Sequence, residues 1–218
     1  EGTALLRVTF DELATGTIAG VTTNALRMIL VAPLDSAGTY YWAKEGSVGK
    51  LLVRKQDALT ICSVPDLLFF VRPEVVGERI FAVSSEKRLL QISFYRQAEP
   101  RVRRLAQLGR GVSLMRVLSD RIVIANHDRL IFYDIQTGEM LADAGEVEAT
   151  HLFRDSQGTL LAIHRNGQLL VINPTNPLER RILADSTSDH PCVVVAFIEQ
   201  NPLYSLSEDW DVCRLDFN

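Results

Sequence analysis

The stretch Thr159–Asn173, TLLAIHRNGQLLVIN, places two short apolar runs on either side of Asn166-Gly167. Asn-Gly between alternating hydrophobic residues favours a tight β-hairpin, because both residues tolerate the positive φ that such a turn requires. The same fifteen-residue pattern recurs without gaps at Arg79–Ser93 (RIFAVSSEKRLLQIS) and at Pro202–Asp216 (PLYSLSEDWDVCRLD). The sequence therefore predicts a repeat protein in which every repeat contains a hairpin.

Outward from these hairpins, short runs rich in apolar and β-branched residues follow one another along the chain, separated by turn residues. A looser hairpin joins Thr39–Lys44 to Lys50–Lys55, and the run Asp66–Val71 is predicted to be the first strand of the following unit. Each unit then holds four strands in about 40 residues. No window shows sustained helical spacing of apolar residues without a Pro or Gly. The sequence therefore predicts an all-β fold.

A period of about 40–45 residues with four strands per unit is typical of a β-propeller built from four-stranded antiparallel blades. A β-sandwich is the competing architecture, but it does not require hairpins that recur in register. We expect residues 1–218 to form a single propeller domain. If Thr17–Thr23 completes the last blade, the ring has about five blades, but Ala4–Phe10 then competes with Asp211–Phe217 for one place. The alternative is part of a larger ring, or a ring completed by a partner chain.

Composition and charge are those of a soluble globular protein, with 47% hydrophobic residues, 23% charged residues and a net charge of −4. The longest apolar runs, such as Cys192–Ile198, are far shorter than the ~20 residues of a membrane-spanning helix, so no membrane insertion is expected. Cys62, Cys192 and Cys213 form no CxxC pair, which favours buried free thiols. The sequence has no N-glycosylation sequon and no basic-then-apolar leader, which favours an intracellular location, in the cytoplasm or nucleus.

Two hairpins carry a resemblance to a known family. SEDWDVCRLD (Ser207–Asp216) has a small residue, a turn acid, a β-branched residue three positions later and a strand-ending pair. HDRLIFYDIQTGE (His127–Glu139) has a similar strand end followed by a TGE turn. In these features the chain resembles the WD-repeat propeller family over nearly its whole length. The resemblance implies that turn acids anchor a hydrogen-bond network, at the matching positions Glu86, Asp128, Asn166 and Asp209.

The sequence also departs from that family's pattern. Its literal Trp210-Asp211 dipeptide lies in a hairpin turn and not at a strand end, and no Gly-His pair opens any unit. We therefore predict a degenerate WD-repeat-like protein or another propeller family with the same spacing. The equivalents of the family's strand-ending pair are Ile92-Ser93, Tyr133-Asp134, Ile172-Asn173 and Leu215-Asp216.

Motifs for cofactor or metal chemistry are weak. Gly46-Ser-Val-Gly49-Lys50 lacks the spacing of a phosphate-binding loop, and Leu51 stands where Ser or Thr would bind magnesium, so a turn is predicted. The four histidines share no metal-ligand spacing with each other or with a cysteine; they are His127, His151, His164 and His190. We expect no cofactor and no metal.

Enzymatic activity is the less favoured class of function. Five-bladed propellers include glycoside hydrolases, which need two carboxylates projecting into the channel from the innermost strands. The nearest acids here, Asp66, Asp155 and Glu199, lie at the ends of the presumed innermost strands or just beyond them. Regular strands without a catalytic arrangement favour a non-enzymatic interaction scaffold or a subunit of a multiprotein complex, with a hydrolase as an alternative.

Charge is distributed unevenly. Between Arg79 and Arg129 the sequence has eleven basic and four acidic residues, a local charge of +7 in a chain of net −4. A solvated outer edge, where basic residues block strand-to-strand aggregation, is one interpretation. The others are an acidic protein partner or RNA, bound by a patch of Arg96, Arg101, Arg103 and Arg104.

The hairpin turns suggest a second surface. In a propeller the turns between the second and third strands of the blades gather on one face. Trp210, in the polar turn SEDWD, is a candidate contact residue, although it could instead fold back over its own blade. The predicted partner-binding residues on this face are Lys87, Arg88, His127, Arg129, Arg165 and Trp210.

Overall fold

The computed structural model describes residues 28–55, 58–94, 99–154, 159–165, 168–184, 192–197, 203–207 and 212–215. These residues form twenty β-strands and no helix, which confirms the prediction of an all-β fold. The chain divides into two compact units, Glu1–Arg110 and Gly111–Asn218, and each is described here by itself. The predicted strands Ala4–Phe10 and Thr17–Thr23 lie outside the described residues, and the single domain over 1–218 stays a prediction.

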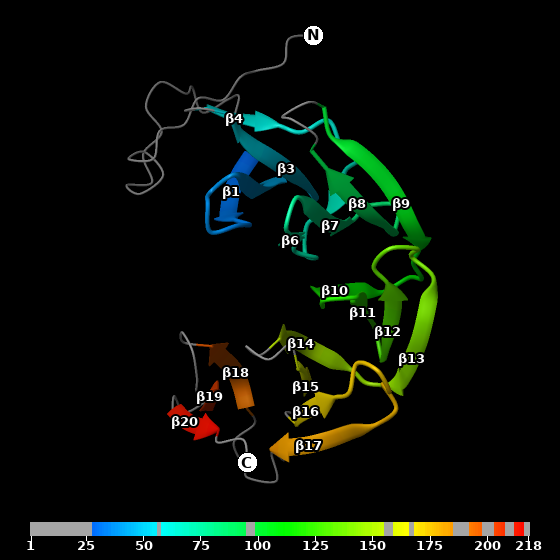
Figure 1. The fold of residues 1–218 in the computed structure, drawn as a ribbon. Coiled ribbons are helices and arrows are strands. Elements are labelled where there is room, and N and C mark those ends of the chain that lie inside the picture. Colours follow the sequence, from blue (N-terminus) through cyan, green and yellow to red (C-terminus); the bar gives the residue numbers. More distant parts are fainter. Residues whose placement is uncertain are drawn as a thin grey trace. The chain divides into compact units, whose positions relative to one another are not determined.

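The first unit contains two antiparallel sheets whose strands follow chain order (Figure 1). One consists of β1 (Met28–Pro33), β2 (Tyr40–Glu45), β3 (Val48–Lys55) and β4 (Ala58–Ile61). The other consists of β6 (Glu74–Val76), β7 (Arg79–Val83), β8 (Arg88–Ser93) and β9 (Arg101–Gln107). Arg79 pairs with Ser93 across the β7–β8 hairpin, so the predicted hairpin at 79–93 is confirmed.

One predicted strand belongs to a different sheet. Asp66–Val71 was expected to open the second sheet, but only β5 (Leu67–Leu68) forms in this run, and it pairs with Val48 and Gly49 of β3. Its contact with the second sheet is limited to an isolated bridge between Leu67 and Ser84, just after β7. The second sheet opens instead with the short β6, after Pro73. Leu67 is fully buried in a core that both sheets share, so this apolar run fills the space between the sheets. An apolar run indicates burial, and it does not indicate which neighbouring strand it will pair with.

Close packing in the core of the first unit explains why residue 49 is a glycine. The indole of Trp42 is 2% exposed and stacks on Phe69, with the ring centroids 6.1 Å apart. A Cβ atom at Gly49 would come within 1.7 Å of the Trp42 ring. Gly49 is therefore required by close packing of an aromatic side chain against the backbone, and the second glycine of the rejected phosphate-loop pattern has a structural role.

The second unit repeats the same design (Figure 1). Its first sheet consists of β10 (Val112–Val117), β11 (Arg121–Asn126), β12 (Arg129–Asp134) and β13 (Met140–Glu146). Its second consists of β14 (Ala149–Arg154), β15 (Leu160–His164), β16 (Leu169–Ile172) and β17 (Arg180–Ala184), and its third of β18 (Cys192–Phe197), β19 (Leu203–Ser207) and β20 (Val212–Leu215). The hairpins predicted from 159–173 and 202–216 form as β15–β16 and β19–β20.

Apolar side chains join the first two sheets of this unit. One buried cluster contains Phe132 and Leu130 from β12 together with Leu160 and Leu170 from the next sheet. The guanidinium Nε of Arg116 on β10 also donates a 2.7 Å hydrogen bond to the carbonyl of Leu152 on β14. A four-stranded sheet cannot bury both of its faces alone, so stacking on a neighbour supplies the core.

Two strand ends carry the same polar turn. The Asp134 carboxylate accepts hydrogen bonds from the backbone N–H groups of Gln136 and Thr137, at 2.8 and 2.6 Å. Asn173 has the same role after β16, where its Oδ1 accepts from the N–H of Thr175 at 3.0 Å. The hydrogen bonds from Thr137 and Gln136 hold the pKa of Asp134 below its ordinary value. The strand-ending positions identified from the WD-repeat resemblance thus stabilise the turns into β13 and β17.

Candidate functional site

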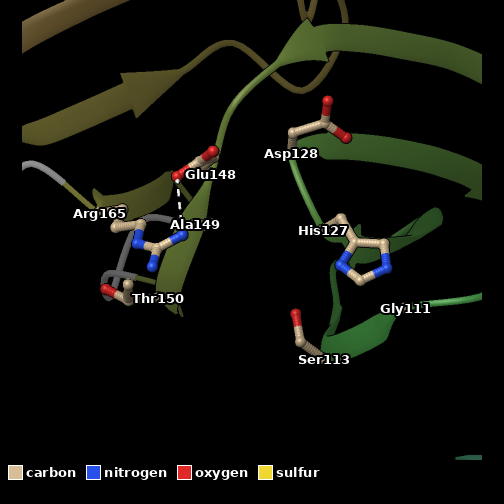
Figure 2. A pocket seen from close by; sticks show the side chains of 8 residues that line it. All are labelled: Gly111, Ser113, His127, Asp128, Glu148, Ala149, Thr150 and Arg165. Atoms are coloured by element: carbon tan, nitrogen blue, oxygen red, sulfur yellow. Dashed lines mark ion pairs between the residues drawn. The ribbon is translucent and has the colours of Figure 1, made fainter.

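A polar pocket of about 620 Å³ opens on the surface of the second unit (Figure 2). It lies where the first two sheets of that unit meet, at the end that carries the β11–β12 and β15–β16 turns. We call it the turn pocket. Its lining residues are Gly111, Ser113, His127, Asp128, Glu148, Ala149, Thr150 and Arg165.

The position of His127 is fixed by the backbone around it. His127 has a φ of +50°, an uncommon conformation for a residue with a side chain, and its N–H donates a 3.1 Å hydrogen bond to the carbonyl of Gly111. The imidazole lies over Gly111, where an added Cβ would come within 2.0 Å of the ring. Gly111 itself has a φ of +84°. The backbone conformations of these two residues hold the imidazole at the edge of the turn pocket.

The pocket carries charges of both signs (Figure 2). Arg165 faces Glu148 with the Nη1 to Oε2 distance at 3.6 Å, and their side chains are 78% and 45% exposed. An ion pair this exposed adds little stability, so its charges stay available to a ligand. The carboxylate of Asp128 is exposed and forms no ion pair or hydrogen bond with a described residue. A ligand would therefore meet a guanidinium, two carboxylates and an imidazole.

The hydroxyl groups in the pocket are engaged with the protein. Ser113 Oγ donates to the carbonyl of Ala125 at 3.5 Å, and Thr150 Oγ1 donates to the carbonyl of Ile163 at 3.2 Å. Among the described residues no hydrogen bond joins Ser113 to His127 or His127 to Asp128. Both hydroxyl groups thus donate to backbone carbonyls of neighbouring strands within the second unit.

The structure separates the predicted partner-binding residues into groups. His127 and Arg165 both line the turn pocket. Arg129 does not line it, because its Nη2 pairs with Asp143 Oδ2 on β13 at 2.6 Å. Lys87 and Arg88 occupy the corresponding turn of the β6–β9 sheet in the first unit, and Trp210 lies outside the described residues. Whether any of these residues contacts a partner stays a prediction.

The turn acids differ from the resemblance where the structure describes them. The Glu86 carboxylate is 65% exposed and pairs with Arg88, and the Asp128 carboxylate faces the turn pocket. Neither anchors a hydrogen-bond network, because both side chains project from tight turns toward solvent. Asn166 and Asp209 lie outside the described residues.

Sequence reasoning missed the contribution of the first strands to this pocket. Gly111 lies just before β10 and Ser113 within its start, while Glu148 lies just before β14 and Ala149 and Thr150 within its start. The signal was present in the antiparallel pattern, because the start of a first strand pairs with the end of the second strand, next to the hairpin turn. The register shows this directly: Val112 pairs with Asn126, and Ala149 pairs with His164.

The basic residues between Arg79 and Arg129 divide into two classes. Several hold structural interactions, such as Arg121 with Asp120, a pairing that lowers the pKa of that carboxyl group. Arg101, Arg103 and Arg104 instead stand exposed on the edge strand β9. Arg96 lies outside the described residues.

The hydrolase alternative considered from the sequence finds limited support. Asp66, one of the acids considered for a hydrolase, pairs with Lys50 at 2.5 Å, while Asp155 and Glu199 lie outside the described residues.

Within the described part of the chain, no group of three His, Cys, Asp or Glu residues could hold a metal ion. Cys62 is buried and forms no disulfide with a described residue, as predicted. No helix in the described ranges has the length and hydropathy needed to span a membrane.

Comparison with known proteins indicates the fold of the chain. No protein-family model matches the sequence, and a search of curated proteins finds no match. Among solved structures, Hsv2 of Kluyveromyces lactis, a β-propeller protein, is similar to the chain, with a TM-score of 0.57 and 11% identity over 82% of this chain and 63% of that one. The chain has a β-propeller fold.

Two further solved structures are similar to the chain. The computationally designed protein Ika8 has a TM-score of 0.60 at 11% identity and covers 82% of this chain and 56% of its own. PorZ of Porphyromonas gingivalis, a surface component of that bacterium's type-IX secretion system, has a TM-score of 0.55 at 12% identity over 81% and 26%. The chain thus spans less than two thirds of each of these structures. At such low identity the likeness shows the propeller fold, and it does not assign the chain to the WD-repeat family.

Proposed function

We propose that this β-propeller is a non-enzymatic interaction module that holds a protein partner at the turn pocket. The observation that carries the proposal is the pocket itself, which collects exposed charged groups of both signs from two neighbouring blades. Propellers similar to this one generally serve as scaffolds for protein interactions. The predicted contact residues His127 and Arg165 line the pocket, which supports this choice of face.

The mixture of charges indicates a polar peptide segment as the ligand. Arg165 can form a bidentate pair with a partner carboxylate. The carboxylate of Asp128, which is bonded to no described residue, can accept hydrogen bonds from a partner Lys, Arg or backbone N–H. Exposed ion pairs are individually weak, so the contribution of these groups is mainly to orientation and specificity.

Site-specific photo-crosslinking tests this proposal. A photo-reactive phenylalanine analogue at Thr150, an exposed residue of the pocket, is expected to capture a discrete protein from an extract of the source cells. The matched control places the same analogue at Met140, which is 63% exposed but does not line the pocket. Arg165→Glu should abolish the crosslink at position 150. Equal capture at both positions, or no capture at position 150, would rule out the turn pocket as the partner site.

A further inference from the structure

The edge strand β9 offers a second surface that does not involve the turn pocket. β9 is the last strand of its sheet and pairs with β8, from Arg101 opposite Ser93 to Gln107 opposite Arg88. No described strand pairs with its other edge. A strand edge of seven residues presents a row of backbone N–H and C=O groups that can pair with an extended segment of another protein.

The charges on β9 are not neutralised within the protein. Arg101, Arg103 and Arg104 are all exposed, and none of their guanidinium groups forms an ion pair or side-chain hydrogen bond with a described residue. The strand, RVRRLAQ, contains no acidic residue. By contrast, the half-buried Arg88 and the exposed Arg129 each pair with a carboxylate nearby. β9 therefore keeps three positive charges available.

The spacing of these charges matches that of an added strand. Residues 101 to 104 pair in regular register with β8, since the only irregularity lies beyond them, opposite Leu89 and Leu90. Side chains two positions apart in a strand lie on the same face, roughly 6.6 Å apart. Arg101 and Arg103 thus share one face, and a partner strand with an acid at every second residue would repeat at the same interval. Val102, which is 36% exposed, shares the other face with Arg104.

We infer that β9 binds an acidic, extended segment of a partner protein by strand addition. Edge arginines are also a device against aggregation, because they repel a second copy of the same basic strand. The same positive charge attracts a strand that carries negative charge. The arginines can therefore both prevent self-association and favour an acidic partner. RNA is less well matched, because β9 has no aromatic residue on which bases could stack, and its free backbone edge is suited to another strand.

Fluorescence anisotropy with defined probes tests this inference. The probe is a labelled twelve-residue peptide in which Glu and Thr alternate, and we expect saturable binding that weakens as salt is raised. Arg101→Gln combined with Arg103→Gln should weaken binding about tenfold, as loss of two partly exposed ion pairs predicts. The matched control, Arg110→Gln with Arg181→Gln, removes the same charge from exposed sites outside β9 and should change affinity less than about twofold.

Three further probes distinguish strand addition from simple charge attraction and from RNA binding. A Lys-Thr peptide should not bind, and a Glu-Thr peptide that is N-methylated at every second residue should bind much more weakly, because it cannot pair along one edge. Failure of the Glu-Thr peptide to bind, equal losses in the two double variants, or undiminished binding of the N-methylated peptide would overturn the inference. Binding of a twelve-nucleotide oligouridylate that depends on Arg101 and Arg103, without peptide binding, would assign β9 to RNA. Circular dichroism confirms that each variant is folded, and photo-crosslinking at Thr150 reports separately on the turn pocket.

Discussion

Strands β9 and β13 hold the same place in their sheets, but Asp143 of β13 is paired within the protein, whereas the arginines of β9 pair with no described carboxylate. Each is the fourth and outermost strand of a four-stranded sheet. Asp143 of β13 is bonded within the protein, to Arg129 and to the backbone N–H of Gly145. The arginines of β9 have no such partners among the described residues. Charge on an edge strand can therefore stabilise the blade or remain available for binding, and the two roles can be separated by measurement.

The largest expected effect is the loss of stability when Asp143 is replaced. Asp143→Ala removes the acceptor of the Gly145 N–H, at 2.8 Å, and the partner of the Arg129 guanidinium. We expect a loss of about 1–2 kcal/mol in the free energy of unfolding, from one backbone hydrogen bond and one half-exposed ion pair. Urea denaturation measures this loss. Arg103→Gln on β9 is the control and should change stability by less than about 0.5 kcal/mol. Equal losses at the two positions would remove the distinction between the strands.

A smaller effect is expected for the coupling between Arg129 and Asp143 alone. The side chain of Arg129 is 54% exposed, so solvent and salt screen the pair. A double-mutant cycle with Arg129→Ala and Asp143→Ala should give a coupling of about 0.5–1 kcal/mol at low salt, and less at high salt. A coupling of zero at low salt would show that the stability contributed by Asp143 comes from the Gly145 hydrogen bond, and that the charge itself is as free as those of β9.

The smallest effect is expected at the turn that leads into β13, and it depends on pH. The pKa of Asp134 is lowered in the folded protein, so its ionised form stabilises the fold above the ordinary pKa of an aspartate, and this stability is lost as pH falls through the folded value. Asp134→Asn should keep the turn, because Asn173 forms the equivalent turn before β17, but it should lose the contribution of the charge. The wild-type protein should therefore have the higher melting temperature at neutral pH, and the difference should shrink in acid. A difference that is independent of pH would contradict this assignment.

The sequence predicted the hairpins well because two independent signals agree there. The hairpin at 79–93 is indicated by its apolar runs and by recurrence of the pattern of 159–173, and the structure forms it with Arg79 opposite Ser93. The assignment of Asp66–Val71 was correct only in part, because apolar character indicates burial without specifying the pairing partner: Leu67 and Leu68 pair with β3, and Leu67 also forms an isolated bridge with Ser84, next to β7. Short, partly polar strands such as β6 carry too weak a pattern to be recognised from one sequence.

The candidate site was predicted only in part, because a sequence marks its turns but does not show which distant segments pair. His127 and Arg165 could be found because they belong to hairpin turns, which are marked in the sequence. Glu148 could not be placed beside Arg165 without the register of β14 on β15, since the two residues are separated by an entire hairpin. Pairing between distant segments sets which charges meet, and this also explains why Arg129 turns to Asp143 while the arginines of β9 stay free.

The most direct test of the central claim, that β9 is a binding edge and β13 is not, is hydrogen–deuterium exchange with and without the Glu-Thr peptide. Strand addition predicts slower exchange for the backbone N–H groups of Arg101–Gln107, with no change for Met140–Glu146. The effect should disappear in the variant that carries Arg101→Gln and Arg103→Gln. Unchanged exchange in β9 at saturating peptide, or equal protection of both strands, would contradict the account.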